Sequence, residues 1–181
     1  ILAEATRNLG GRVIKESNLL GLAEWRRVSD WRITQINKLS NVEIYRESEL
    51  VAKDVTELNA DFVMIATGAK WSEDALGRHS DTGFETVDTN MIIGAEHVLN
   101  GEKIDGDRIV IYDDDHYYIG SVMALELSRR GHSVVLVTPA GRACSWGEYT
   151  DEQVPSNLAL YDANVKVITN KTIINVRITI T

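Results

Sequence analysis

The stretch RIVIYDDDHYYIGSVMALELSRRGHSVVLV, residues 108–137, carries the pattern that decides the fold. Residues 108–112 and 133–137 are short apolar runs rich in β-branched side chains, which favours buried parallel strands. The residues between them, from about 118 to 130, follow a helical pattern, and Gly131 is a predicted C-cap. Strand, helix and strand over about 30 residues make a βαβ unit. We therefore predict an α/β fold with a Rossmann-type unit in this half of the chain.

The turn that follows the first of these strands lacks the glycines of a dinucleotide-binding site. Such a site has G-x-G-x-x-G between strand and helix, where backbone N–H groups approach the pyrophosphate. Here residues 113–115 are three consecutive aspartates, Tyr117 and Tyr118 follow, and the next strand ends in Thr138 rather than an acid. The carboxylates would repel a phosphate, so we predict that this unit binds no nicotinamide dinucleotide. A plain solvated loop is the alternative, and it leads to the same expectation.

Other segments extend the alternation of helices and strands. Residues 70–89 are rich in Gly, Asp, Ser and Thr and are expected to form an ordered crossing or linker. Trp31 lies off the apolar stripe of the helix predicted over residues 21–39 and is a candidate residue of a contact surface. The remaining predicted helices are 21–39, 53–58, 94–99 and 151–161, and the remaining predicted strands are 42–45, 61–65, 165–168 and 170–181.

Composition excludes several classes of protein. With 181 residues, 44% of them hydrophobic and 25% charged, the chain can bury an ordinary globular core. A net charge of -8 without a basic cluster argues against nucleic acid, and no apolar run approaches the length of a membrane span, so a cytoplasmic protein is expected. The single cysteine, Cys144, cannot hold a four-cysteine cluster, and the four histidines have no metal-ligand spacing. The abrupt first and last residues suggest a piece of a longer polypeptide.

Several segments together resemble the C-terminal part of the trimethylamine dehydrogenase family, which includes dimethylamine and histamine dehydrogenases. The resemblance covers nearly the whole chain. The segments that carry it are residues 2–5, 9–13, 21–25, 35–39, 60–61, 65–69, 113–118, 131–132 and 137–139. Related reductases of the dienoyl-CoA type, which use NADPH, share this layout but keep a glycine-rich second turn.

The resemblance implies a Rossmann-like, three-layered arrangement of two adjoining FAD/NAD(P)-binding-like lobes with mainly parallel sheets. Residues 1–90 would form a partial FAD/ADP-binding-like lobe, rejoined by 169–181, and residues 91–168 an NAD-binding-like lobe with a degenerate dinucleotide turn. Full-length members carry FMN and a 4Fe-4S cluster in an N-terminal barrel, hold ADP, pass electrons to an electron-transferring flavoprotein and form a homodimer. The chain itself is expected to hold no redox cofactor and no metal and to be inactive alone.

The resemblance also implies the residues that meet ADP. Glu4 would bind the adenosine ribose, Gly11 and Arg12 would lie on the pyrophosphate side, and residues Ala66, Thr67 and Gly68 would pass close to it. Without the resemblance, an exposed glutamate at a strand end remains an open alternative for Glu4. Two other functions also remain open: an NAD(P)H-dependent flavoprotein reductase domain of the dienoyl-CoA reductase type, and a free-standing ADP-binding module.

Overall fold

The computed structural model describes residues 1–74, 76–79, 81–83, 85–86 and 91–176. The chain divides into two compact units, Ile1–Ala69 and Lys70–Thr181. The predicted lobe boundary at residue 90 stays a prediction.

The regular structure of the first unit is mainly helical. Its elements are β1 (Leu2–Ala3), α1 (Gly11–Glu16), the 3-10 turn η1 (Ala23–Trp25), α2 (Arg26–Ile36), β2 (Ile44–Tyr45) and α3 (Ala52–Glu57). The two strands pair in parallel, with Leu2 opposite Ile44. The helix predicted over 21–39 is thus a 3-10 turn followed by a shorter α-helix. Gly10, at φ +114°, lets the start of α1 approach Ser29 of α2, whose hydroxyl would collide with any Cβ at this position.

The strand predicted over residues 61–65 is wrong. These residues are irregular, and Met64 and Ile65 are 94% and 84% exposed. A buried parallel strand needs neighbouring strands and cover on both faces. In the described part of this unit, the only sheet is the two-residue pair of β1 and β2. The apolar character of the run is therefore not matched by a surface that buries it.

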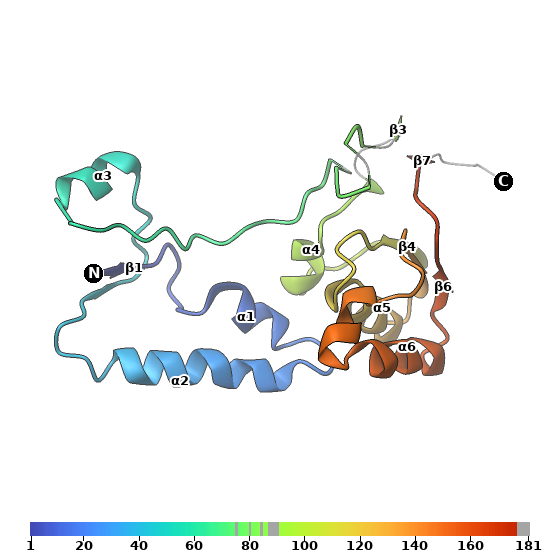
Figure 1. Ribbon diagram of the computed structural model, residues 1–181, viewed down its shortest axis with the longest axis horizontal. Coiled ribbons are helices and arrows are strands. Elements are labelled where there is room, and N and C mark those ends of the chain that lie inside the picture. The colour runs from blue at the N-terminus through green and yellow to red at the C-terminus, as the bar shows by residue number, and fades with distance from the viewer. Residues whose placement is uncertain (75, 80, 84, 87–90, 177–181) are drawn as a thin grey trace. The chain divides into compact units, whose positions relative to one another are not determined.

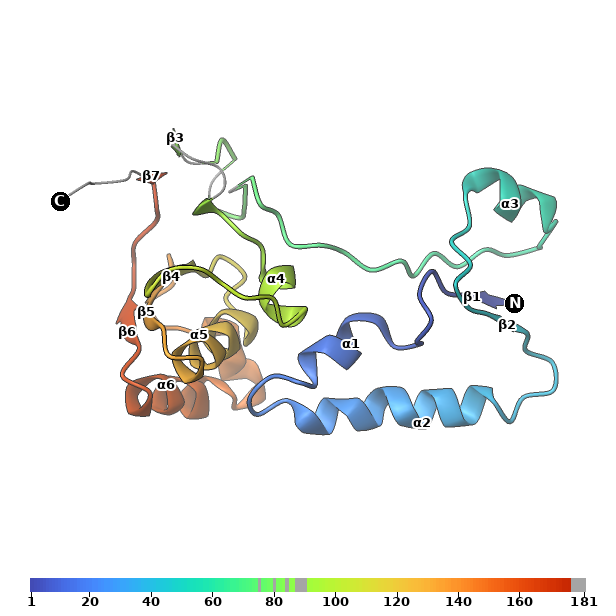
Figure 2. The same ribbon diagram turned by 180° about the vertical axis from the view of Figure 1, so that it is seen from behind.

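The second unit contains the predicted βαβ arrangement. Its central sheet has the order β4-β5-β6, all parallel, formed by β4 (Arg108–Tyr112), β5 (Ser133–Val137) and β6 (Lys166–Ile168). The helix α5 (Ile119–Arg129) connects β4 to β5, and α6 (Gln153–Asp162) precedes β6. These two helices lie side by side against the sheet in both ribbon views (Figures 1 and 2). The βαβ prediction is confirmed, with both predicted strands at their predicted residues.

Shorter elements complete this unit. They are β3 (Glu85–Thr86), α4 (Ala95–Leu99), the 3-10 segment η3 (Ser145–Thr150) and β7 (Asn175–Val176). β7 pairs in parallel with β3 (Figure 1). The strand predicted over 170–181 is present only as β7, and residues 177–181 lie outside the described residues, as do 75, 80, 84 and 87–89 of the predicted linker.

The core of the second unit lies between the sheet and its two helices. Side chains from β5, α5 and α6 meet there, among them the fully buried Leu136, Ala124 and Leu160. The C-cap expected after α5 is confirmed, since Gly131 adopts φ +96° and its N–H group donates to the carbonyl of Ser128. Because β4 and β5 are parallel, their carboxyl ends come to one edge of the sheet.

An ionic cluster around the buried carboxylate of Glu126 lies at the C-terminal end of α5. The Glu126 carboxylate is almost fully buried and accepts bonds from Arg129, at 2.7 Å and 3.0 Å, and from Arg130, at 2.9 Å. Arg130 also donates to the carbonyl of Val98 in α4. The cluster therefore ties α4 to α5.

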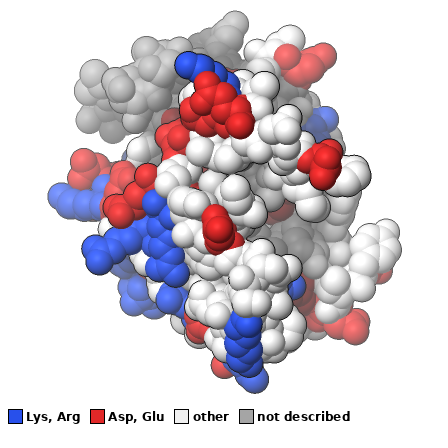
Figure 3. Space-filling model, turned by 90° about the vertical axis from the view of Figure 1, so that its left-hand side faces the viewer, with Lys and Arg blue, Asp and Glu red and all other residues white. Residues whose placement is uncertain are grey.

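The acidic excess of the sequence does not give a uniformly acidic surface. In the space-filling view of one face, basic side chains gather along one margin, with acidic ones beside them and uncharged atoms over much of the rest (Figure 3). No helix in the described part of the chain has the length and apolar character needed to cross a membrane.

Candidate functional site

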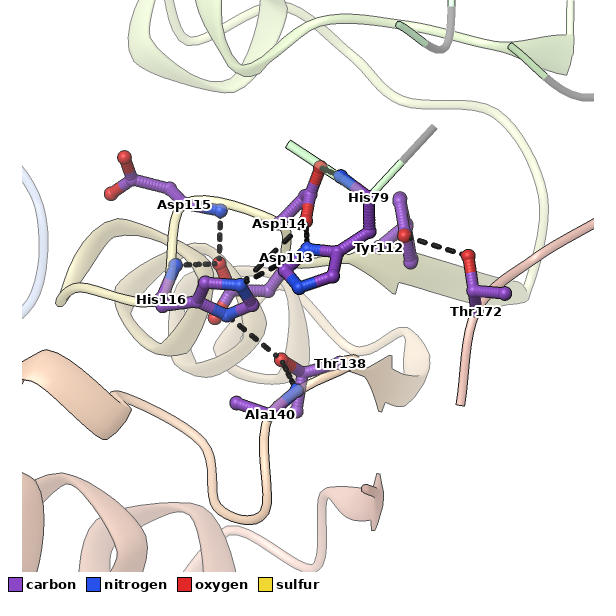
Figure 4. Close-up of polar contacts among 9 residues, drawn as sticks. All are labelled: His79, Tyr112, Asp113, Asp114, Asp115, His116, Thr138, Ala140 and Thr172. Carbon is purple, nitrogen blue, oxygen red and sulfur yellow. Dashed lines mark hydrogen bonds and ion pairs between the residues drawn. The ribbon is translucent and has the colours of Figure 1, made fainter. Parts of the chain in front are cut away.

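The turn between β4 and α5 is organised around the carboxylate of Asp113. Asp113 continues β4, because its N–H group donates to the carbonyl of Val137 at 2.8 Å. Its side chain is only 3% exposed and turns back into the loop (Figure 4). There, Oδ1 accepts the backbone N–H groups of Asp115, at 3.2 Å, and His116, at 3.1 Å. These two N–H groups, which could otherwise approach an anion, are already bound to a carboxylate.

Gly120 provides the space that the Asp113 side chain occupies. A Cβ at Gly120 would lie 2.5 Å from Cγ of Asp113 and 2.8 Å from its Oδ2. That Oδ2 atom is buried and has no hydrogen-bond partner among the described residues. Burial raises the pKa of Asp113 to about 6, helped by the charge of Asp115 and opposed by the bond from His116. The buried side chain of Asp113 can therefore occupy this space only because residue 120 is glycine.

His116 completes the turn with its ring buried beneath it. Its backbone is left-handed, with φ +67°, and its carbonyl accepts the N–H group of Trp146. Ring atom Nδ1 lies 3.4 Å from the hydroxyl of Thr138, at the end of β5. Burial and the neighbouring His79 lower the pKa of His116, although Asp114 acts in the opposite direction. The neutral imidazole is thus favoured.

A third side chain, Asp114, joins the turn to the segment that precedes β4. Its Oδ2 accepts the backbone N–H group of His79 at 3.1 Å, and its Oδ1 is hydrogen-bonded to Nδ1 of the same histidine. The ring of His79 stands at 80° to that of His116, with centroids 5.0 Å apart. Gly77 permits this approach, since a Cβ there would collide with the Asp114 carboxylate.

No local pattern in the sequence indicates this grouping. His79 and His116 are separated by 37 residues, so no local spacing marks them. The signal that could have found them is the position of Asp114 and His116 at the carboxyl end of a parallel strand, where side chains from distant segments converge. The structure brings together atoms that can accept a proton or bind a cation: two imidazole nitrogens and a carboxylate oxygen.

The site residues expected in the first unit lie at its strand end and first helix. Glu4 follows β1, and its Oε1 accepts both the N–H and the hydroxyl group of Thr6, each at 2.8 Å. Gly11 begins α1 at φ +50°. Arg12 donates to the carbonyl of Ala69 at 2.5 Å, the residue that follows the exposed, irregular residues Ala66, Thr67 and Gly68. The structure thus joins Arg12 to the 66–69 segment, and binding at these residues stays a prediction.

Comparison with known proteins gives the relationship of the chain. Residues 93–179 match the OYE-like second alpha/beta domain. Dimethylamine dehydrogenase of Hyphomicrobium sp. (strain x) is 30% identical over 174 residues, which is 92% of this chain and 24% of that protein. Histamine dehydrogenase of Rhizobium sp. 4-9 has a structure with a TM-score of 0.90 and 38% identity, covering 97% of this chain and 26% of that one. This chain is homologous to dimethylamine and histamine dehydrogenases.

Two further solved structures widen the comparison. The 6-hydroxypseudooxynicotine amine oxidase of Pseudomonas geniculata N1 has a TM-score of 0.87 and 32% identity, covering 97% of this chain and 26% of that one. A 2-naphthoyl-CoA reductase shares the fold alone. Its structure has a TM-score of 0.74 and 20% identity, and the match covers 97% of this chain and 25% of that one. The chain spans about a quarter of the length of the relatives it matches. It is part of an oxidoreductase family whose matched members include amine dehydrogenases.

Proposed function

We propose that this chain is the nucleotide-binding-like C-terminal region of an iron–sulfur flavoprotein amine dehydrogenase, and that it performs no redox chemistry itself. The first unit would hold ADP, the second would be a Rossmann-like NAD-binding lobe that no longer takes a dinucleotide, and the surface would receive an electron-transferring flavoprotein. The intact, cytoplasmic homodimer would carry out oxidative N-demethylation of the trimethylamine dehydrogenase type.

The absence of redox chemistry from this chain is supported by its composition. A 4Fe-4S cluster takes four thiolates, and the sequence contains one cysteine. That cysteine, Cys144, is fully buried, and burial raises the pKa of its thiol. The cluster is therefore assigned to another part of the enzyme, and the family resemblance assigns FMN and the amine pocket there as well.

One observation carries the proposal for the second unit: the Asp113 carboxylate binds the N–H groups of Asp115 and His116. In a dinucleotide site the pyrophosphate receives such N–H groups at the turn between strand and helix. Here a phosphate would have to displace a buried carboxylate that fills the space beside Gly120. It would also meet Asp114 and Asp115, which carry the same sign of charge. The turn is thus closed to NAD(P)H by its own side chain.

The residues of the first unit fit a nucleoside diphosphate chemically. Glu4 offers a carboxylate at the end of a parallel strand, which suits ribose hydroxyl groups. Arg12 offers a guanidinium against the 66–69 segment, which suits a phosphate. When bound, ADP would supply no chemistry and would act as a structural ligand. Glu4 would orient the ribose and Arg12 would neutralise part of the diphosphate charge.

Calorimetric titration of the intact enzyme tests the division of roles. We expect NADPH to give no heat of binding at concentrations up to about 1 mM, which corresponds to less than roughly 4 kcal/mol of binding free energy. Tight NADPH binding would contradict the proposal and favour the reductase alternative. For ADP, Glu4→Gln should lower the bound nucleotide content, whereas the exposed control Glu57→Gln should not. Equal ADP content in both variants would exclude Glu4 as a ribose ligand.

Docking of the electron acceptor is tested separately. Trp31 on α2 is 63% exposed, which makes it a suitable contact for a partner protein. Trp31→Ala in the intact enzyme should slow electron transfer to the flavoprotein and leave flavin reduction by the amine unchanged. An unchanged transfer rate would remove Trp31 from the docking surface.

A further inference from the structure

We propose that His79, Asp114 and His116 form a binding site for a divalent transition-metal ion, with zinc as the reference ion. The three residues come from two segments of the second unit: His79 from the stretch before β4, and the other two from the turn after it (Figure 4). Their ligating atoms all lie within 4.8 Å of one another. Nothing in the proposed amine chemistry requires this site.

The separations of the ligating atoms match those around a tetrahedral ion. Zinc binds imidazole nitrogen and carboxylate oxygen at about 2.0–2.2 Å, which places two ligands of a tetrahedron roughly 3.3–3.6 Å apart. Nε2 of His116 lies 3.4 Å from Nδ1 of His79 and 3.6 Å from Oδ1 of Asp114. Two of the three distances between ligating atoms, which are the edges of the tetrahedron, therefore have the required length without rearrangement.

The third edge, between His79 and Asp114, is at present a direct hydrogen bond. An ion would replace the proton shared by these two atoms, and a small rotation of the His79 ring would open the edge. His79 can make this movement because its side chain is 46% exposed, whereas Asp114 and His116 are largely covered. The site thus has two anchored ligands and one adjustable ligand.

The surroundings orient the two anchored ligands. The hydroxyl of Thr138 lies 3.4 Å from Nδ1 of His116, which leaves Nε2 of that ring facing the cluster. Oδ2 of Asp114 is held by the backbone N–H group of His79, which leaves Oδ1 facing the cluster. Outer bonds of this kind fix the orientation of metal ligands in known sites.

The ligand set defines the class of ion and leaves one position open. Two imidazoles and one carboxylate suit zinc, cobalt, nickel or copper better than magnesium or calcium, which prefer oxygen ligands alone. Three protein ligands leave the fourth position of a tetrahedron for water. The neighbouring Asp113 and Asp115 add negative charge that favours a cation. Bound metal would tie the segment containing His79 to the β4–α5 turn.

Zinc titration of the chelator-treated chain by calorimetry is the direct test. We expect one ion per chain for the wild type and loss of that binding in His79→Gln and in Asp114→Asn. His79→Gln is the decisive variant because its side chain is half exposed, so the substitution removes a ligand without removing a core side chain. Circular dichroism checks that each variant is folded. Thr138→Val should weaken binding by about 10- to 100-fold, as expected for an outer-shell partner.

His97 provides a matched control. It also bonds two carboxylates, but Glu73 binds its Nε2 and Glu102 its Nδ1, so the two contacts are on opposite ring nitrogens and cannot converge on one ion. His97→Gln should therefore keep the zinc site. Absence of zinc binding to the wild type, or equal binding by His79→Gln and His97→Gln, would overturn the proposal and leave a metal-free hydrogen-bonded cluster. Neither outcome bears on the amine dehydrogenase proposal.

Discussion

The carboxylate of Asp113 accepts the backbone N–H group of His116 at 3.1 Å, so the turn between β4 and α5 contains its own anion. The turn occupies the place where a dinucleotide fold receives phosphate. Because the bond lies within the chain, it forms whenever the domain folds. The same carboxylate is buried and close to Asp114 and Asp115, so its charge has an energetic consequence.

Asp113 makes stability depend on pH. Its pKa is raised from 3.8 to about 6, mainly by burial. The folded state therefore binds this proton more tightly than the unfolded chain does, and the resulting stabilisation is full below about pH 4 and is lost as the pH rises through about 6, above which Asp113 is an anion. The full shift corresponds to about 3 kcal/mol. Asp113→Asn removes this titration, so wild type should lose stability relative to the variant across that window in urea unfolding experiments.

Asp105→Asn is the matched control for this experiment, because Asp105 is exposed and pairs only with Lys103 among the bonds described. Asp113 is unchanged in this variant, so the variant should keep the pH dependence that Asp113 gives the wild type. A constant difference between wild type and Asp113→Asn would mean that Asp113 ionises as it does in the unfolded chain.

Gly120→Ala should destabilise the second unit although alanine is the better helix former. The added Cβ would lie 2.5 Å from Cγ of Asp113, so the aspartate must move and release its N–H partners. Overpacking of this kind costs about 1–3 kcal/mol. Gly141→Ala is the control, since its Cβ would have only Asn170 nearby, at 3.9 Å. Equal urea midpoints for the two variants would show that a Cβ at position 120 fits beside Asp113 without displacing it.

Glu126→Gln tests the ionic cluster between α4 and α5. The bonds from Arg129 and Arg130 lower the pKa of Glu126, so its contribution is present above its ordinary value of 4.5 and is lost as the pH falls. Bonds to charged groups contribute about 1.5–3 kcal/mol, and we expect the variant to lose up to that amount at pH 7. The exposed pair of Lys53 and Glu57 is the comparison, where Glu57→Gln should cost less than about 1 kcal/mol. A similar loss in both would remove the distinction between buried and exposed pairs.

The βαβ unit could be predicted because its information is local. Residues 108–112 and 133–137 are apolar runs of strand length, and Gly131 marks the end of the intervening helix in the sequence itself. The three aspartates predict that phosphate is repelled from this turn, and that exclusion stays a prediction. The conformation of the turn could not be predicted: one aspartate turns inward, and its carboxylate accepts two backbone N–H groups.

The cluster of His79, Asp114 and His116 could not be predicted because its information is not local. It depends on the path of the segment before β4, which brings the backbone at Gly77 against the carboxylate of Asp114. Apolar character alone also misled at residues 61–65. A run of that composition can form a strand only where other strands pair with it, and pairing is a property of the whole fold.

The contribution of Ile65 to stability can be compared with that of a buried core residue. Ile65 is 84% exposed, so Ile65→Ala should change the free energy of unfolding by less than about 0.5 kcal/mol. Leu136 in β5 is fully buried, and Leu136→Ala should cost about 2–5 kcal/mol because it leaves a cavity between the sheet and α5. Urea unfolding of both variants gives the comparison. A loss of several kcal/mol at Ile65 would mean that residues 61–65 do pack as the strand their composition suggests, against a surface other than the β1–β2 pair.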